Sequence, residues 1–161
     1  MSCTCQHPPD VLLYFSASTR DGGTHGRPEF NIPEHVSLPF DVSTYKCYID
    51  VLRFHVQSFV TDIDETIVLK LTSHNQMNSY DTITKAPSEV IAVQGQSQVP
   101  GVYSNMRQSL PPIQISSSPL GGTIKFHVAT VNLSTSGNVT YTDCNPTRDS
   151  YFVLRCSFKE H

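Results

Sequence analysis

Apolar and polar residues alternate with a period of two along most of the chain after residue 35. In residues 45–51, one face of the predicted strand carries Tyr45, Cys47, Ile49 and Val51. A second apolar set follows one residue out of phase, at Leu52, Phe54 and Val56. A phase shift of one residue inside a strand predicts a β-bulge near Val51 and Leu52, or burial on both faces of the strand.

Later segments alternate in the same way, which predicts further strands. The residues expected to face inward are Ile67, Leu69, Leu71, Ile113, Ile115, Ile124, Phe126, Val128, Phe152, Leu154, Cys156 and Phe158. Shorter strands are expected within residues 36–40, 80–84, 89–94 and 138–142. No window shows helical periodicity, and strands do not alternate with helices. The pattern therefore predicts an all-β, antiparallel β-sandwich of about eight or nine strands and excludes a doubly wound sheet.

The first 34 residues do not share this pattern. Prolines stand at positions 8, 9, 28 and 33, RDGGTHGRP reads as a connector, and only VLLYFSAS, residues 11–18, has the character of a strand. We predict an N-terminal arm over residues 1–34 with one strand, and a sandwich domain over residues 35–161. An ordinary first strand followed by a long loop is the alternative.

The longest predicted connection spans residues 95–112. Loops of this length are typical of functional or flexible segments. It offers Tyr103, Met106 and Arg107, residue types that are enriched in protein interfaces. We treat these three residues as a candidate interface, with a plain surface crossover between two sheets as the alternative.

Three carboxylates cluster between two predicted strands, at Asp62, Asp64 and Glu65, with His55 upstream. A calcium loop would offer more oxygen ligands and a glycine, and TDIDET has no glycine. Aspartate is common in turns because its side chain bonds nearby backbone N–H groups. We therefore interpret the segment as a polar hairpin turn whose carboxylates stay in water or meet a neighbouring subunit.

Two other groups could hold a metal. His55 and His127 occupy matching tetrads, Arg53–Val56 and Lys125–Val128, and two histidines on adjacent strands could bind a metal. Simple strand alternation explains both tetrads and is favoured. The segment Cys3, Cys5 and His7 lacks the spacing and the second pair of a structural zinc site. We expect no bound metal and no cofactor.

Composition narrows the class of protein further. The chain has 161 residues, 16% of them charged, a net charge of −3 and 34 Ser or Thr residues. The sequence contains no run of basic residues, so direct binding to nucleic acid is not expected. No apolar run reaches the ~20 residues of a membrane span. Five cysteines without a visible secretory signal favour reduced thiols in a cytosol-like compartment. Signatures such as G-x-S-x-G, a P-loop or H-E-x-x-H are missing, so we expect no enzyme.

YKCYIDVLRFHVQSFVTDIDETIVLKL, followed by NSYDTIT and later by GGTIKFHVATV and SYFVLRCSF, resembles the single jelly-roll capsid proteins of large icosahedral double-stranded DNA viruses. These are the penton and minor capsid proteins. The resemblance covers residues 35 to 158. It rests on the strand rhythm, the low charge, the Ser/Thr-rich turns and the Phe-rich last strand.

The resemblance implies an eight-stranded jelly roll of two four-stranded sheets, in which residues 1–34 reach neighbouring subunits. It implies a structural virion protein that forms homo-oligomers, in rings of five for pentons, binds other capsid proteins and is assembled in the host cytoplasm. A ligand- or carbohydrate-binding sandwich is the alternative. The chain has no Trp, and the tyrosines that could stack on a sugar are Tyr14, Tyr48, Tyr80, Tyr103 and Tyr141. A trimeric signalling jelly roll of the tumour-necrosis-factor type is disfavoured because no signal or membrane anchor is visible.

Overall fold

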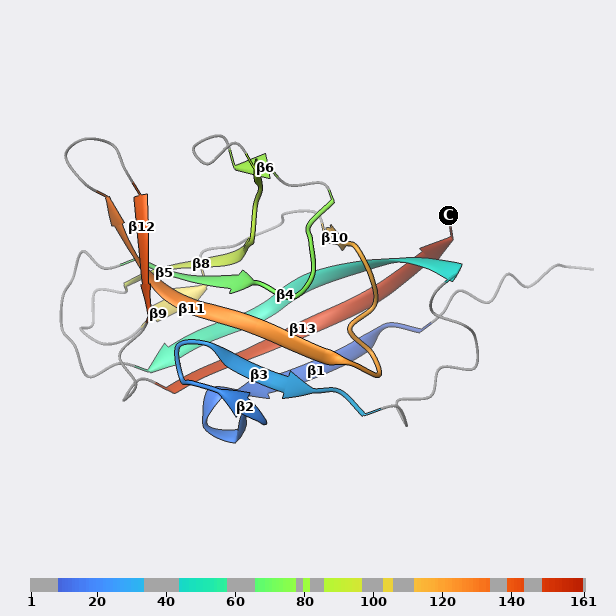
Figure 1. Cartoon of the computed structure of the whole chain (residues 1–161), viewed down its shortest axis with the longest axis horizontal. Coiled ribbons are helices and arrows are strands. Elements are labelled where there is room, and N and C mark those ends of the chain that lie inside the picture. Colours follow the sequence, from blue (N-terminus) through green and yellow to red (C-terminus); the bar gives the residue numbers. More distant parts are fainter. Residues whose placement is uncertain are drawn as a thin grey trace, which may run out of the picture.

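Two antiparallel β-sheets face each other in the computed structural model of the chain (Figure 1). The structure describes residues 9–33, 44–57, 66–77, 80–81, 86–96, 103–105, 112–133, 139–143 and 149–160. Within these ranges the regular elements are strands and one three-residue 3-10 turn, η1 (Ala17–Thr19). The predicted all-β class and the sandwich arrangement of antiparallel sheets are confirmed. No helix in this part of the chain has the length and apolar character needed to cross a membrane.

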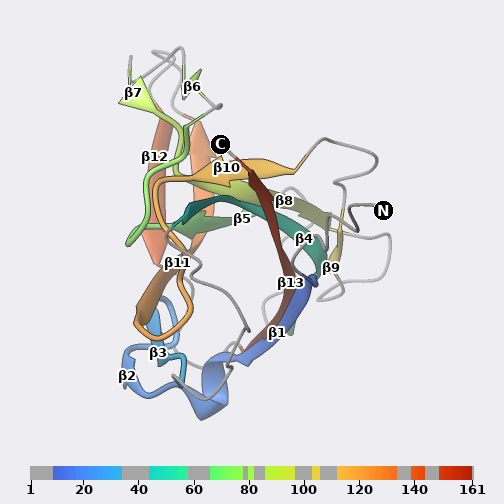
Figure 2. The same cartoon turned by 90° about the vertical axis from the view of Figure 1, so that its right-hand side faces the viewer.

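The first sheet has the strand order β1-β13-β4-β10. Its strands are β1 (Val11–Ser16), β13 (Asp149–Glu160), β4 (Tyr45–Gln57) and β10 (Ile113–Ile115). The central strands β4 and β13 are paired along their full length. β1 and β10 therefore form the two edges of this sheet (Figure 2).

The second sheet has the order β2-β3-β11-β5-β8-β9, and β12 also pairs with β11. Its strands are β2 (Gly22–Gly23), β3 (Pro28–Asn31), β11 (Thr123–Leu133), β5 (Thr66–Leu71), β8 (Val90–Gln96), β9 (Tyr103–Asn105) and β12 (Val139–Asp143). β3 and β12 share one edge of β11, at residues 123–125 and 129–133, while β5 occupies the other edge. A separate ribbon consists of β6 (Tyr80–Asp81) and β7 (Ala86–Pro87).

Alternation places one apolar face of each sheet in the core between them. Every inward-facing residue predicted from Ile67 to Phe158 is buried in this core. Its centre is a cluster of aromatic rings contributed by both sheets: Phe15 of β1, Phe30 of β3, Phe54 of β4, Phe126 of β11 and Phe152 of β13. Ring centroids in the cluster are as close as 4.7 Å, for Phe126 and Phe152. Such aromatic pairs each contribute about 0.5–1.5 kcal/mol beyond the area they bury.

A β-bulge interrupts β4 where the sequence predicts one. Arg53 lies opposite Val153 and Val51 lies opposite Leu154, so Leu52 is the extra residue. Val51 and Phe54 are buried, whereas Leu52 is exposed. The bulge thus lets both apolar sets of the strand face the same core, and it turns Leu52 outward.

Residues 11–31 belong to the sandwich, which differs from the predicted arm. β1 pairs with β13 in the first sheet and β3 pairs with β11 in the second. Phe15 and Phe30 enter the core from these strands. Gly22, Gly23, Gly26 and Pro28, which suggested an irregular arm, lie in β2, in β3 or in the tight turn between them, where Gly23 has a φ of 75°.

The connections also differ from the predicted ones. β4 and β5 lie in different sheets, so the acidic segment between them joins the two sheets and is not a hairpin turn. The long connection after residue 95 contains a short strand, β9, which pairs with β8. Beyond residue 34, the described ranges hold ten strands, β4 to β13. β6 falls within the predicted segment 80–84, whereas β7 and β9 are short strands that period-two alternation does not mark. The strand predicted at residues 36–40 lies outside the described ranges.

Candidate interaction surface

The outer face of the first sheet exposes four large apolar side chains. Their exposed fractions are 47% for Leu12, 64% for Tyr14, 44% for Leu52 and 37% for Tyr151. They come from three adjacent strands, β1, β13 and β4. We call these four residues the outer apolar face.

The strand register shows how these residues are arranged. Tyr14 lies opposite Val153, which is itself opposite Arg53 on β4. Val153 is buried although its neighbours along the strand, Phe152 and Leu154, fill the core on the inner side. In the next rows, Leu12 lies opposite Arg155 and Tyr151 opposite His55. The apolar residues are therefore neighbours on one continuous surface.

Arg155, on this face, is paired with carboxylates. The guanidinium of Arg155 donates a hydrogen bond of 2.9 Å to Asp50, and Asp10 lies 4.0 Å away. The ammonium of Lys159 lies 4.7 Å from the ring centroid of Tyr48. An apolar area with locally paired charges at its margin is typical of surfaces that bind other proteins.

A polar cluster lies on the opposite side of the sandwich, on the second sheet. The His127 side chain is 4% exposed, and its Nε2 lies 2.6 Å from Oδ1 of Asp143 on β12. The same Oδ1 lies 3.3 Å from Nε of Arg27. A tight turn holds Arg27 in place, because Arg27 N–H donates to Thr24 O and Val128 N–H donates to Gly26 O. The cluster thus ties β12 and the β2–β3 turn to β11.

Burial lowers the pKa of His127, and the nearby cations Arg27 and Lys70 act in the same direction. The hydrogen bond to Asp143 and its negative charge oppose this shift. His127 is therefore held as a neutral imidazole that donates Nε2–H to the Asp143 carboxylate. With its side chain buried and its partner engaged by Arg27, the imidazole serves as a structural link.

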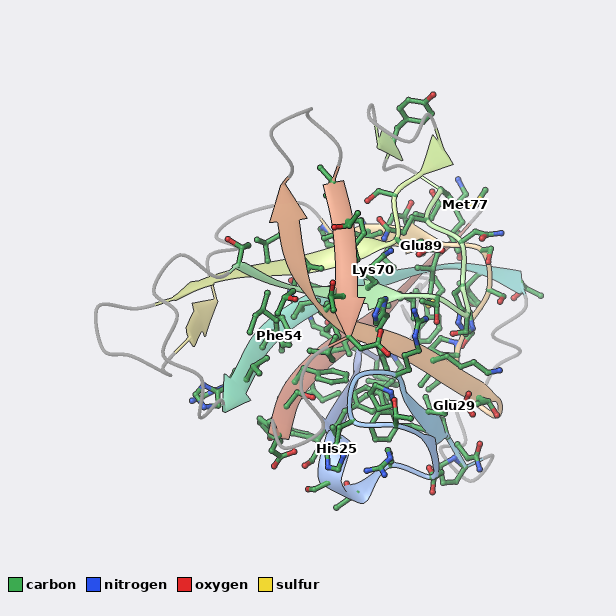
Figure 3. The ribbon with its side chains drawn as sticks, turned by 60° about the vertical axis from the view of Figure 1, so that its left-hand side comes forward. His25, Glu29, Phe54, Lys70, Met77 and Glu89 are labelled. Carbon is green, nitrogen blue, oxygen red and sulfur yellow. The ribbon has the colours of Figure 1, made fainter. Side chains whose placement is uncertain are left out.

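Lys70 lies opposite His127 in the pairing of β5 with β11, and Glu89 lies near Lys70 (Figure 3). Their charged groups are 3.2 Å apart, and the Lys70 ammonium also lies 4.2 Å from the ring centroid of Tyr141 on β12. Only 15% of the Lys70 side chain is exposed. These contacts fasten β12 to β5, so they act in the same way as the His127 cluster.

Two hollows open among the described residues. One, of about 200 Å³, is lined by Leu71, Thr72, His74, Asn75, Gln76, Ser88 and Glu89. Burial lowers the pKa of His74, and Gln76 Oε1 has no hydrogen-bond partner among the described residues. The other, of about 450 Å³, lies against β10 and the start of β4 and includes Met77 and Ser116–Ser118. The first hollow includes Ser88, His74 and Glu89, but the contacts of these side chains lie elsewhere. His74 Nδ1 is 2.7 Å from Ser73 Oγ, Ser88 Oγ accepts a hydrogen bond from Val90 N–H, and the Glu89 carboxylate pairs with Lys70.

The side chains of all six interface residues predicted from the sequence lie outside the described residues. Tyr103 lies in β9, and its side chain is outside the described residues. The remaining five candidates, Asp62, Asp64, Glu65, Met106 and Arg107, also lie outside them. The outer apolar face was missed because VLLYF is an unbroken apolar run, which indicates a strand but not which of its sides is exposed. The available signal was that Leu12 and Tyr14 occupy the positions where a surface strand carries polar residues.

The two tetrads do not form a metal site. His55 lies on β4 in the first sheet and His127 on β11 in the second, each facing away from the core residues that flank it. The two histidines therefore lie on opposite faces of the sandwich. No cluster of three or more metal-ligating side chains occurs in the described ranges. Cys3, Cys5, His7 and Cys144 lie outside those ranges.

Comparison with family models, with curated proteins and with solved structures finds no match for this chain.

Proposed function

We propose that this chain is a structural virion protein, a jelly-roll capsid component of the penton or minor type that assembles with itself and with other capsid proteins. The strand order of the sandwich supports the jelly-roll part of the proposal, and the outer apolar face supports its role in assembly. Leaving out β2, β9, β12 and the β6–β7 ribbon, eight strands remain, and we number them 1 to 8 along the chain. The first sheet then reads 1-8-3-6 and the second reads 2-7-4-5.

This order is the one expected of an eight-stranded jelly roll built from two Greek keys. In such a fold, successive strands cross between the sheets, and the first and last strands are neighbours. The neighbours β1 and β13, and the crossover from β4 to β5, support this topology. Jelly rolls occur in viral capsid proteins, lectins and cupins, so topology alone does not select among these classes.

The outer apolar face favours a role in assembly. A protein that stays monomeric rarely leaves large apolar side chains side by side on one sheet. Leu12, Tyr14 and Tyr151 are of this kind, and Tyr is among the residues that contribute most to interface energies. Stacking sugars on exposed tyrosines would suit a lectin-like function, which is the second candidate.

Electron microscopy and sedimentation of the purified chain test the proposal. We expect discrete rings or other closed oligomers as concentration rises, or a complex with a major capsid protein of a double-stranded DNA virus. The double variant Tyr14→Ser/Tyr151→Ser should weaken one of these associations, whereas Met77→Ser, at an exposed site off this face, should not. A chain that stays monomeric at high concentration and binds no capsid protein would contradict the capsid function.

A glycan array separates the two candidates. The capsid proposal predicts no selective glycan binding through Tyr14 and Tyr151, which lie on adjacent strands. Selective binding that is lost in the same double variant would favour the carbohydrate-binding function.

A further inference from the structure

Among the described residues, the outer edge of β1 lacks the features that keep edge strands from pairing with other chains. Among the described residues, only β13 pairs with β1. The strand reads VLLYFS, with no charge, proline or glycine, and its register against β13 runs without a bulge. Natural sheets protect exposed edges with charges, prolines, bulges or covering segments. This edge is therefore suited to accept another strand.

The opposite edge of the same sheet is protected. β10 has three residues and follows Pro112. Its outer side is covered by residues 75–77, where Met77 N–H donates to Gln114 O and Ser116 N–H donates to Asn75 O. The contrast shows that the fold can cover an edge with its own chain, and that among the described residues it does so for β10 and not for β1.

We propose that β1 pairs in antiparallel fashion with β1 of a second copy, about a two-fold axis at Leu13. The two first sheets would then form one continuous sheet across the contact. The inference rests on the proposed assembly of the chain with itself, and it names one contact of that assembly. It adds an isologous contact, which is distinct from the heterologous contacts that close a ring.

A second copy fits this edge because identical strands are self-complementary in this register. Leu12 of one copy lies opposite Tyr14 of the other, and Val11 lies opposite Phe15. The two exposed apolar residues of β1 thus cover each other, and no like charges meet within the strand. At the ends of the strand, Asp10 faces the hydroxyl of Ser16.

The charges of the outer face also suit a two-fold contact. Across the joined sheets, one row of residues reads Asp50, Arg155 and Leu12 from one copy, then Tyr14, Val153 and Arg53 from the other. The apolar residues stand at the centre of the row and the charges stand at its ends. This arrangement of an apolar centre with a charged margin is typical of protein interfaces.

Charge-swapped variants of the full chain test the pairing by sedimentation velocity. In the proposed register, Leu12→Lys/Tyr14→Lys places the lysine at position 12 of one copy opposite the lysine at position 14 of the other, and Leu12→Glu/Tyr14→Glu does the same with glutamates. Each double variant alone should lose this association by more than about tenfold, because like charges meet in register. An equimolar mixture of the two should restore it, since every lysine then faces a glutamate. Met77→Lys and Val93→Lys, at exposed sites on other surfaces, should associate like the parent chain.

Cross-linking at the axis gives a second readout. In a background with Cys3, Cys5 and Cys144 changed to Ser, Leu13→Cys should form a disulfide-linked dimer, because residues directly opposite in an antiparallel pair have Cα atoms about 4.5–5.5 Å apart. Ser157→Cys, on the outer face away from the edge, should not.

The outcomes separate this inference from the proposed function. If the parent chain assembles while both charged variants assemble equally well, the edge pairing is wrong and assembly through other surfaces stands. If the mixture fails to restore association, or Leu13→Cys gives no dimer, the second copy is not the occupant of this edge. A parent chain that is monomeric at every concentration, with β1 amides protected from hydrogen exchange by its own residues, overturns the inference. If that monomer also binds no capsid protein, the capsid proposal fails with it.

Discussion

Phe152 lies at the centre of the aromatic cluster that joins the two sheets. It is fully buried, and its ring neighbours Phe15, Phe30, Phe54 and Phe126. Replacing it with alanine removes these contacts and leaves a cavity that a β-sandwich cannot readily close. We expect Phe152→Ala to lower the free energy of unfolding by about 3–5 kcal/mol in urea denaturation. Tyr151→Ala, one residue away on the exposed side, should change it by less than about 1 kcal/mol.

The shifted pKa of His127 makes the stability of the folded chain depend on pH. Burial lowers the pKa of His127 and of His74 from 6.5. Because the pKa of each histidine is lower in the folded chain than in the unfolded chain, the unfolded chain binds more protons as pH falls below 6.5. Their contribution to stability is therefore fully present above pH 6.5 and decreases below it.

Variants of His127 and Asp143 should distinguish the contribution of His127 to this pH dependence from that of His74. His127→Gln keeps a donor for Asp143 but cannot titrate, so the acid-side decrease in the free energy of unfolding should become shallower. Asp143→Asn removes the negative charge that raises the pKa of His127, so the decrease should extend to lower pH. Urea unfolding at a series of pH values measures both effects. An unchanged slope in His127→Gln would assign the pH dependence to other residues, His74 among them.

Among the elements, β4 offers a test of strand register. Leu52 is the extra residue of its bulge, and Val51, Arg53 and Phe54 alternate correctly once it is removed. We expect deletion of Leu52 to give a folded chain with little loss of stability. Deletion of Ile49, from the regular part of the strand, should flip the residues on one side of it to the wrong face and abolish cooperative unfolding. Circular dichroism with thermal denaturation distinguishes the two, and equal loss of structure in both would show that the bulge is needed.

The sequence was most informative about the individual strands. Period-two alternation identified the strands around Ile67, Ile124 and Leu154, and the phase shift at Leu52 located the bulge, because these depend on neighbouring residues only. Pairing could not be predicted, because it joins residues far apart in the chain, such as Val11 with Cys156. The polar segment after β4 looked the same whether it closed a hairpin or crossed between sheets.

At the scale of the whole molecule, the candidate site was the hardest part to predict. Interface-type residues in loops drew attention to Tyr103, whereas the exposed apolar residues lie in strands that read as core. Exposure depends on which elements cover a face, and that follows from the strand order. The apolar run in VLLYFS therefore located β1 without showing that Leu12 and Tyr14 face outward at the edge of a sheet.

Removal of the first 34 residues tests whether the sandwich can fold without its N-terminal strands. β1 and β3 supply one strand to each sheet, and Phe15 and Phe30 fill the core between them. A fragment of residues 35–161 should therefore lack cooperative unfolding and expose apolar surface to a hydrophobic dye. Adding a peptide of residues 1–34 should restore the folded signal, because the missing strands can pair with β13 and β11 in trans. An arm that only contacts neighbouring subunits would instead leave the fragment stably folded and impaired in assembly alone, so the unfolding curve of the fragment distinguishes a structural segment from an assembly arm.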